Sequence, residues 1–152
     1  MKRNFSCFLS ALVVLLLFSC GTVQNQTPSR IGLSPLPNYS PAPGRFTTDT
    51  TFSVYKASAD FSGDFSPAAA ETRRPDFNGQ MVVAMVVRNA AQTALQFDRA
   101  EVVGKTINVY AQTCRSQDCP AGPALVATIP KVSEATTVRF FINGESRSEV
   151  RF

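Results

Sequence analysis

The stretch that decides the fold is Gln80-Met81-Val82-Val83-Ala84-Met85-Val86-Val87-Arg88, in which seven consecutive apolar residues lie between two polar ones. The run is short and rich in valine, whose branched side chain favours strands over helices. A strand that is apolar at every position needs cover on both of its faces. The sequence therefore predicts a central, fully buried strand over residues 81–87.

Two further strands are predicted downstream, over residues 95–103 and from Thr106, with Gly104-Lys105 as the turn between them. In the second of these strands apolar and polar residues alternate. The apolar positions are Ile107, Val109 and Ala111, and the polar ones are Asn108, Tyr110 and Gln112. This alternation predicts a strand with one buried face and one face in water.

The carboxyl-terminal part of the chain contains the strongest hairpin signal, Asn143-Gly144, which follows predicted strands over residues 125–129 and 136–142. A two-residue turn there would place Val138 opposite Glu149. Burial of Val150 requires the opposite register, with Val150 facing Val138 and Arg139 facing Glu149. We expect a bulge or a longer loop to resolve the conflict, because a slip of one residue turns every side chain to the other face.

Residues Thr50 to Ala59 place Phe52, Tyr55 and Ala59 at helical spacing, which predicts a short helix. The same segment is rich in β-branched residues, and Phe52 alternates with Val54, so a strand is the alternative. Together these segments predict a mainly β fold: a single antiparallel sheet of five or six strands with one short helix packed against it. An α+β fold is the variant left open.

The amino-terminal segment resembles an export signal. Lys2 and Arg3 precede an apolar run over residues 8–18, which is too short to span a bilayer core of about 30 Å as a helix. The following Leu17-Phe18-Ser19-Cys20 resembles the lipobox of bacterial lipoproteins. The resemblance implies removal of residues 1–19 as a signal peptide and attachment of lipid, with acyl chains such as palmitate, to Cys20.

Residues 20–44 are predicted to form a flexible tether, because this segment holds five of the ten prolines and few apolar residues. Arg30 to Leu33 can add an edge strand. The folded domain is then expected over residues 45–152. Gly21 follows the lipidated cysteine, which, by resemblance to known sorting behaviour, favours the outer membrane as the location.

The chain contains no histidine, which excludes Ser-His and Cys-His nucleophile pairs and the common zinc sites. Serine–lysine catalysis stays formally open. Without Lys2 and Arg3, 13 basic residues face 11 acidic ones, a net charge of +2 that is too small to indicate nucleic-acid binding. The sequence predicts no enzyme, no cofactor and no metal site.

Cys114 and Cys119 are the cysteines that remain once Cys7 leaves with the signal and Cys20 takes lipid. A redox-active pair is more often separated by two residues, and a structural metal needs four ligands. In an oxidising compartment the pair predicts a disulfide that closes the loop after a strand.

Three aspartates, Asp60, Asp64 and Asp76, each precede a phenylalanine. Their spacing does not match a calcium-binding loop, and aspartates that begin turns are the simpler interpretation. Arg73-Arg74 is a small basic patch that we expect on a solvated loop.

The stretch Pro75-Asp76-Phe77-Asn78-Gly79-Gln80-Met81-Val82-Val83-Ala84-Met85, with Thr128-Ile129-Pro130-Lys131 further on, resembles the carboxy-terminal domain of the protease complex subunit PrcB family. The resemblance spans about residues 46 to 142 and favours a helix over 50–59. It departs from the family in the segment 89–97, which contains no glycine where the family often has Thr-Gly-Gly-Tyr. It implies a lipoprotein that accompanies an extracytoplasmic protease without cleaving substrates itself.

These observations predict a non-enzymatic lipoprotein of the cell envelope, held to the membrane through Cys20, that acts as a protein-interaction domain. A protease complex is the partner that the resemblance implies. The alternative is a small ligand- or glycan-binding module that uses exposed aromatic residues such as Tyr110 on the wet face of the sheet.

Overall fold

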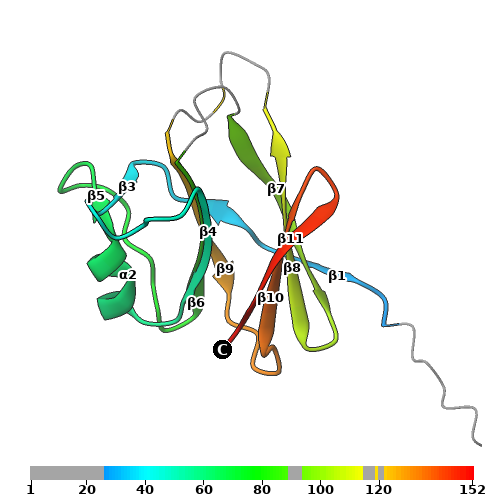
Figure 1. Cartoon of the computed structure of the whole chain (residues 1–152). Coiled ribbons are helices and arrows are strands. Elements are labelled where there is room, and N and C mark those ends of the chain that lie inside the picture. Colours follow the sequence, from blue (N-terminus) through cyan, green and yellow to red (C-terminus); the bar gives the residue numbers. More distant parts are fainter. Residues whose placement is uncertain (1–25, 89–93, 115–118, 120–121) are drawn as a thin grey trace, which may run out of the picture.

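The computed structural model describes residues 26–88, 94–114, 119 and 122–152, and its strands form three sheets (Figure 1). The five-stranded sheet has the order β1, β7, β8, β10, β11. Its strands are β1 (Ser29–Ile31), β7 (Leu95–Val103), β8 (Thr106–Thr113), β10 (Thr137–Ile142) and β11 (Glu145–Arg151). The four-stranded sheet has the order β2, β9, β6, β4. Its strands are β2 (Ser34–Pro35), β9 (Ala124–Pro130), β6 (Gln80–Val87) and β4 (Thr50–Tyr55).

A third layer covers the outer face of the four-stranded sheet. It consists of the helix α2 (Ser58–Asp64) and a two-stranded sheet of β3 (Tyr39–Pro41) and β5 (Phe65–Pro67) (Figure 1). The four-stranded sheet is therefore the middle layer of three.

The run Met81–Val86 explains this arrangement, because every one of its residues is buried. Met81, Val83 and Met85 face the five-stranded sheet, where Val109 and Phe140 belong to the same core cluster. Val82, Ala84 and Val86 face the opposite way and pack in a second cluster under α2 and the two-stranded sheet. The prediction of a central strand covered on both faces is confirmed.

The prediction of a mainly β fold is confirmed. The prediction of a single antiparallel sheet is wrong, because the strands form three sheets. After β8 the chain crosses to the other sheet, where β9 pairs with β6. It then returns to the five-stranded sheet, where β10 pairs with β8. Because β9 runs back through the other layer, β8 and β10 point the same way and pair in parallel. All other strand pairs of the described residues are antiparallel.

The hairpin prediction is confirmed in detail. Val138 pairs with Val150 and Arg139 with Glu149, and the register shifts between Phe140 and Phe141. Asn143 and Gly144 both have positive φ, 52° and 84°, as a tight hairpin turn requires. The extra residue of the bulge is what allows Val150 to face the core.

The helix prediction over Thr50–Ala59 is wrong in position. Residues Thr50–Tyr55 form strand β4, and the helix begins at Ser58. The β-branched residues and the pairing of β4 with β6 prevail over the helical spacing of Phe52 and Tyr55. The seven-residue helix has no side-chain cap, and its packing comes from the buried Phe61.

The prediction of a flexible tether over residues 20–44 is wrong for residues 29–41. Within this segment β1, β2 and β3 pair with β7, β9 and β5, and Leu36 is buried. The edge strand expected near Arg30 is confirmed as β1. The folded part of the chain thus begins near Ser29, well before the predicted boundary at residue 45.

Candidate functional site

The predicted lipid-attachment residue, Cys20, lies outside the described residues, as does the signal segment 1–19. Lipid attachment and the signal peptide therefore stay predictions. Among the helices of residues 26–152 that the structure describes, none is long and apolar enough to cross a membrane.

The predicted disulfide between Cys114 and Cys119 is confirmed, with the two Cα atoms 5.7 Å apart. The backbone N–H of Cys114 donates to the carbonyl of Ala94, which precedes β7. Residues 115–118 of the loop that it closes lie outside the described part. The staple therefore fixes the chain at the end of the sandwich where β8 ends.

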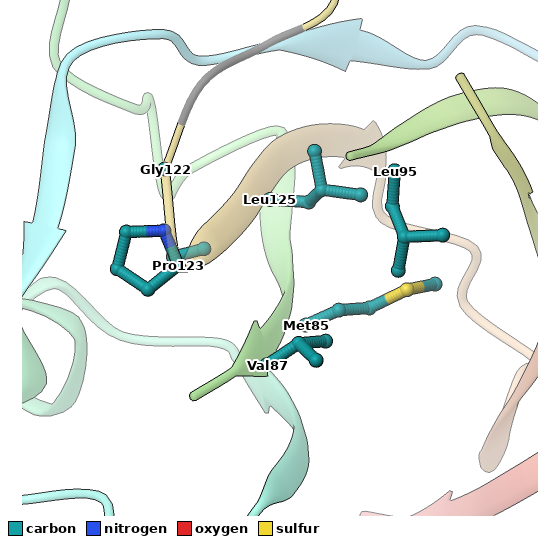
Figure 2. Close-up of a pocket in the computed structure, with 7 residues that line it drawn as sticks. Met85, Val87, Leu95, Gly122, Pro123 and Leu125 are labelled. Atoms are coloured by element: carbon teal, nitrogen blue, oxygen red, sulfur yellow. The ribbon is translucent and has the colours of Figure 1, made fainter. Parts of the chain in front are cut away.

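A small cavity lies near this end, between the middle sheet and β7 (Figure 2). The side chains of Met85, Val87, Leu95 and Leu125 line it, together with Pro123. Its volume is about 10 Å³, which holds one water molecule at most. It is too small to be a ligand site.

Tyr110, the predicted platform for a ligand, lies on the outer face of the five-stranded sheet between two neighbours. The Arg99 guanidinium lies 3.9 Å from the centroid of its ring, and the ring of Phe141 stacks on it at 4.8 Å. Because β8 runs between β7 and β10, these neighbours cover opposite faces of the Tyr110 ring. The geometry leaves no free face of that ring for stacking on a sugar.

Several charged groups on this outer face form ion pairs with one another. Arg99 bonds to Glu101 and Asp98, and Glu149 accepts from Arg139 and Arg151. Hydrogen bonds from Arg139 and Arg151 hold the pKa of Glu149 below its ordinary value. Side chains that are already paired in this way are less available to a charged ligand.

A hollow in the third layer is a better candidate site. Its volume is about 280 Å³, and its wall is largely aromatic. The residues that line it are Tyr39, Ser58, Phe61, Ser62, Phe65, Pro67, Arg74, Pro75 and Phe77. We call it the aromatic hollow.

The aromatic hollow is built around Phe61, which stacks on Phe65 at 5.3 Å between ring centroids. Tyr39 and Phe77 pack on Phe61 at 5.0 and 6.0 Å. Phe61 and Phe65 are buried, whereas Tyr39 and Phe77 are half-buried and form the open part of the wall. The three phenylalanines are those that follow Asp60, Asp64 and Asp76, so the repeated Asp-Phe pair was the sequence signal for this site.

The aspartates themselves differ in role. Asp76 accepts from the backbone N–H of Asn78, as expected of a residue that begins a turn. Asp64 instead accepts from the Tyr55 hydroxyl at 2.9 Å and from Arg45 Nε at 2.8 Å, which ties α2 to β4. Burial raises the pKa of Tyr55 above its ordinary value, and the bond to Asp64 contributes to the rise. The turn interpretation therefore fails for Asp64.

The rim of the aromatic hollow carries the predicted basic patch. Arg73 and Arg74 are both exposed, as expected, and Arg74 lines the hollow. The Tyr39 hydroxyl donates to the carbonyl of Arg73 at 3.1 Å, which holds this loop against β3. Burial raises the pKa of Tyr39, and the positive charge of Arg74 partly offsets the rise.

The chain contains one Ser-x-x-Lys motif, the spacing of serine–lysine nucleophile pairs, as Ser53-Val54-Tyr55-Lys56. Ser53 lies within strand β4, whereas Lys56 follows Tyr55, the last residue of that strand. The Lys56 ammonium lies over the Phe152 ring, 4.8 Å from its centroid. This geometry does not favour a serine nucleophile activated by Lys56.

Comparisons of the chain with protein-family models, with curated proteins and with solved structures give no match. The described residues contain no cluster of three or more His, Cys, Asp or Glu side chains that could hold a metal ion. A second hollow, of about 290 Å³, lies beside Phe46 and Arg88, and Arg88 is the last described residue before segment 89–93. The aromatic hollow is therefore the site on which a functional argument can be built.

Proposed function

We propose that this chain is a non-enzymatic lipoprotein of the cell envelope, anchored through Cys20, that acts as a protein-interaction domain. The anchoring rests on the lipobox resemblance of residues 17–20. A role as accessory subunit of an extracytoplasmic protease complex rests on the resemblance to the PrcB family.

The observation that supports a protein partner is the aromatic hollow. Pockets for small molecules usually have volumes of about 300–1,000 Å³, so a hollow of about 280 Å³ fits one large apolar side chain better than a whole ligand. Binding energy at protein interfaces concentrates in such pockets, where an aromatic or aliphatic anchor is buried. Tyr39 and Phe77 supply an apolar wall for the anchor, and Arg74 can contact its backbone carbonyls.

Arg74 has no salt bridge to any residue that the structure describes. Its guanidinium is therefore available to a partner, in contrast to the paired arginines of the outer face. The covered ring of Tyr110 argues against the glycan-binding alternative, because sugars stack on free aromatic faces.

The test is affinity purification of the tagged full chain from detergent-solubilised envelope, with two tryptophan variants. S62W fills the aromatic hollow from its exposed wall without removing a core side chain. S66W is the matched control, since Ser66 is exposed on the neighbouring strand β5 but does not line the hollow. We expect a stoichiometric protein partner with the native chain and S66W, and its loss with S62W.

Equal recovery of the partner with both variants would assign the interaction to another surface. Mass spectrometry of the same purified chain tests the anchor. The expected mass is that of a chain that begins at a diacylglyceryl-modified Cys20, and an unmodified amino terminus would overturn the lipoprotein proposal.

A further inference from the structure

The place where the folded chain begins limits how the domain can sit on a membrane. Strand β1 pairs with β7, with Ser29 opposite Val102. The side chain of Gln26 lies against Gly104 in the β7–β8 turn. The chain therefore enters the fold at the end of the sandwich where that turn lies.

The link from this point to Cys20 is short. Gln26 is the sixth residue after Cys20, and a fully extended chain of six residue steps spans at most about 22 Å. A lipid on Cys20 would thus hold Gln26, whose side chain lies against Gly104, within about 22 Å of the anchored cysteine. A tether that ran to residue 44 would have imposed no such limit, so this constraint depends on β1.

The backbone connects several segments at the same end. The N–H of Thr136 donates to the carbonyl of Lys105, and the N–H of Phe152 donates to the carbonyl of Thr136. Lys56 lies over the Phe152 ring. The β7–β8 turn, the β9–β10 loop and Phe152 also lie at one end of the sandwich in Figure 1. We call this the turn end.

Lysine is distributed unevenly between the two ends. The three lysines after Cys20 are Lys56, Lys105 and Lys131; all are exposed, and all belong to the turn end. Lys131 joins it through its N–H, which donates to the carbonyl of Gly79 just before β6. Two acidic residues belong to loops of the same end: the carbonyl of Asp76 accepts from the N–H of Gln80 at the start of β6, and Glu134 lies between β9 and β10. The Lys131 ammonium donates to the carbonyl of Phe77, and the Lys56 ammonium lies over the Phe152 ring. Lys105 has no such side-chain contact among the described residues, so it is the lysine of this end that is best suited to contact a phosphate group.

We infer that the turn end faces the surface of an anionic phospholipid bilayer, with Lys105 in contact with the headgroups. This inference rests on the proposed lipid anchor at Cys20. The opposite end, where the disulfide and the Asn143-Gly144 turn lie, then points away from the membrane. Strand β8 alone separates the two ends by about 25 Å, which exceeds the Debye length of about 8 Å at physiological salt.

The test compares amine reactivity at the two ends of the acylated full chain. The chain carries an additional R147K substitution, which keeps the charge and places an amine beside the hairpin turn at the far end. It is reconstituted in phosphatidylcholine vesicles that contain about one third phosphatidylglycerol, and in neutral detergent as the reference. A membrane-impermeant, anionic amine reagent labels it, and peptide mass spectrometry gives the rate at each lysine.

We expect labelling of Lys105 to slow about threefold or more in the vesicles, because a surface potential near −30 mV excludes a monovalent anion by about this factor. The amine of R147K should change little. A matched variant with a 20-residue Gly-Ser spacer between Cys20 and Gln26 should lose most of the protection at Lys105, because the tether then no longer holds the turn end at the surface.

The labelling rates are compared on a chain whose mass shows acylated Cys20. Equal slowing of labelling at both ends, or the same protection of Lys105 with and without the spacer, would overturn the inferred orientation. A mass without lipid would instead overturn the anchor, and with it the proposed lipoprotein. The two failures are therefore distinguishable.

Discussion

Strands β6 and β8 lie in neighbouring layers and show what a buried face demands of a sequence. β6 has cover on both sides, and its six central residues are all buried and apolar. β8 has cover on one side, and only Ile107, Val109 and Ala111 are buried. The difference teaches that a continuous apolar run indicates a middle layer, whereas strict alternation indicates an outer one.

The same comparison separates the surfaces that remain for function. On the wet face of the five-stranded sheet, Arg99, Arg139 and Arg151 form ion pairs, and the Tyr110 ring is covered by its neighbours. The third layer, which covers the second face of β6, contains the aromatic hollow and Arg74, which forms no salt bridge with the described residues. The candidate site is therefore a consequence of how the middle sheet is covered.

The largest expected effect on stability comes from comparing two neighbouring phenylalanines, Phe140 and Phe141, between which the β-bulge of the last hairpin lies. Phe140 is fully buried and packs on Phe52 of the other sheet, whereas its neighbour Phe141 lies on the outer face. F140A should lower the free energy of unfolding by about 4 kcal/mol, through lost burial and a cavity. F141A should cost about 1 kcal/mol, through the lost ring contact with Tyr110. Urea unfolding measures both, and similar costs would contradict the assigned faces.

The next prediction sharpens the comparison between β6 and β8. Val82 and Val83 point to opposite faces of β6, and both are fully buried. V82A and V83A should each cost about 2 kcal/mol in urea unfolding. On β8, V109A should cost about as much, while Q112A on the wet face should change stability by less than about 0.5 kcal/mol. A small effect of V82A would mean that the third layer does not cover the middle sheet.

Removal of the disulfide tests a contribution to the free energy of unfolding that comes from outside the two core clusters. Replacing both cysteines, as C114A/C119A, should lower the free energy of unfolding by about 2 kcal/mol, because the small closed loop restricts the unfolded chain. The control is the native chain under reducing conditions, which should be destabilised to the same extent. A variant as stable as the oxidised native chain would contradict the role of the staple.

The smallest effect concerns the ion pairs of the wet face. The pKa of Glu149 is lowered by its bonds to Arg139 and Arg151. The stability that these bonds contribute is thus fully present above the ordinary glutamate pKa and is lost as the pH falls through the lowered value. NMR titration should show the pKa of Glu149 returning towards its ordinary value in R139Q. It should stay lowered in R147Q, because Arg147 pairs with Glu145 instead.

Much of the fold followed from local patterns. Four features could be predicted: the buried strand at 81–87, the alternation in β8, the Val138–Val150 register of the last hairpin and the disulfide. Each depends on residues that are neighbours in the sequence or directly opposed in one hairpin. For the register, a bulge or a longer loop was expected, and the structure has the bulge. The helix was misplaced because the segment fits two periods at once: Phe52 and Tyr55 have helical spacing, whereas Phe52 and Val54 alternate as in a strand. Pairing of β4 with β6, a contact between distant segments, decided between them.

The candidate site was the least predictable part. The sequence contained the three Asp-Phe pairs, but nothing local showed that Phe61, Phe65 and Phe77 converge with Tyr39 from a segment that reads as a flexible tether. The sequence by itself determined which faces are buried, because burial depends on the polarity of each side chain. Only the tertiary structure decided how many layers form, which strands run in parallel and where the chain enters the fold, because these depend on pairings between residues far apart in the chain.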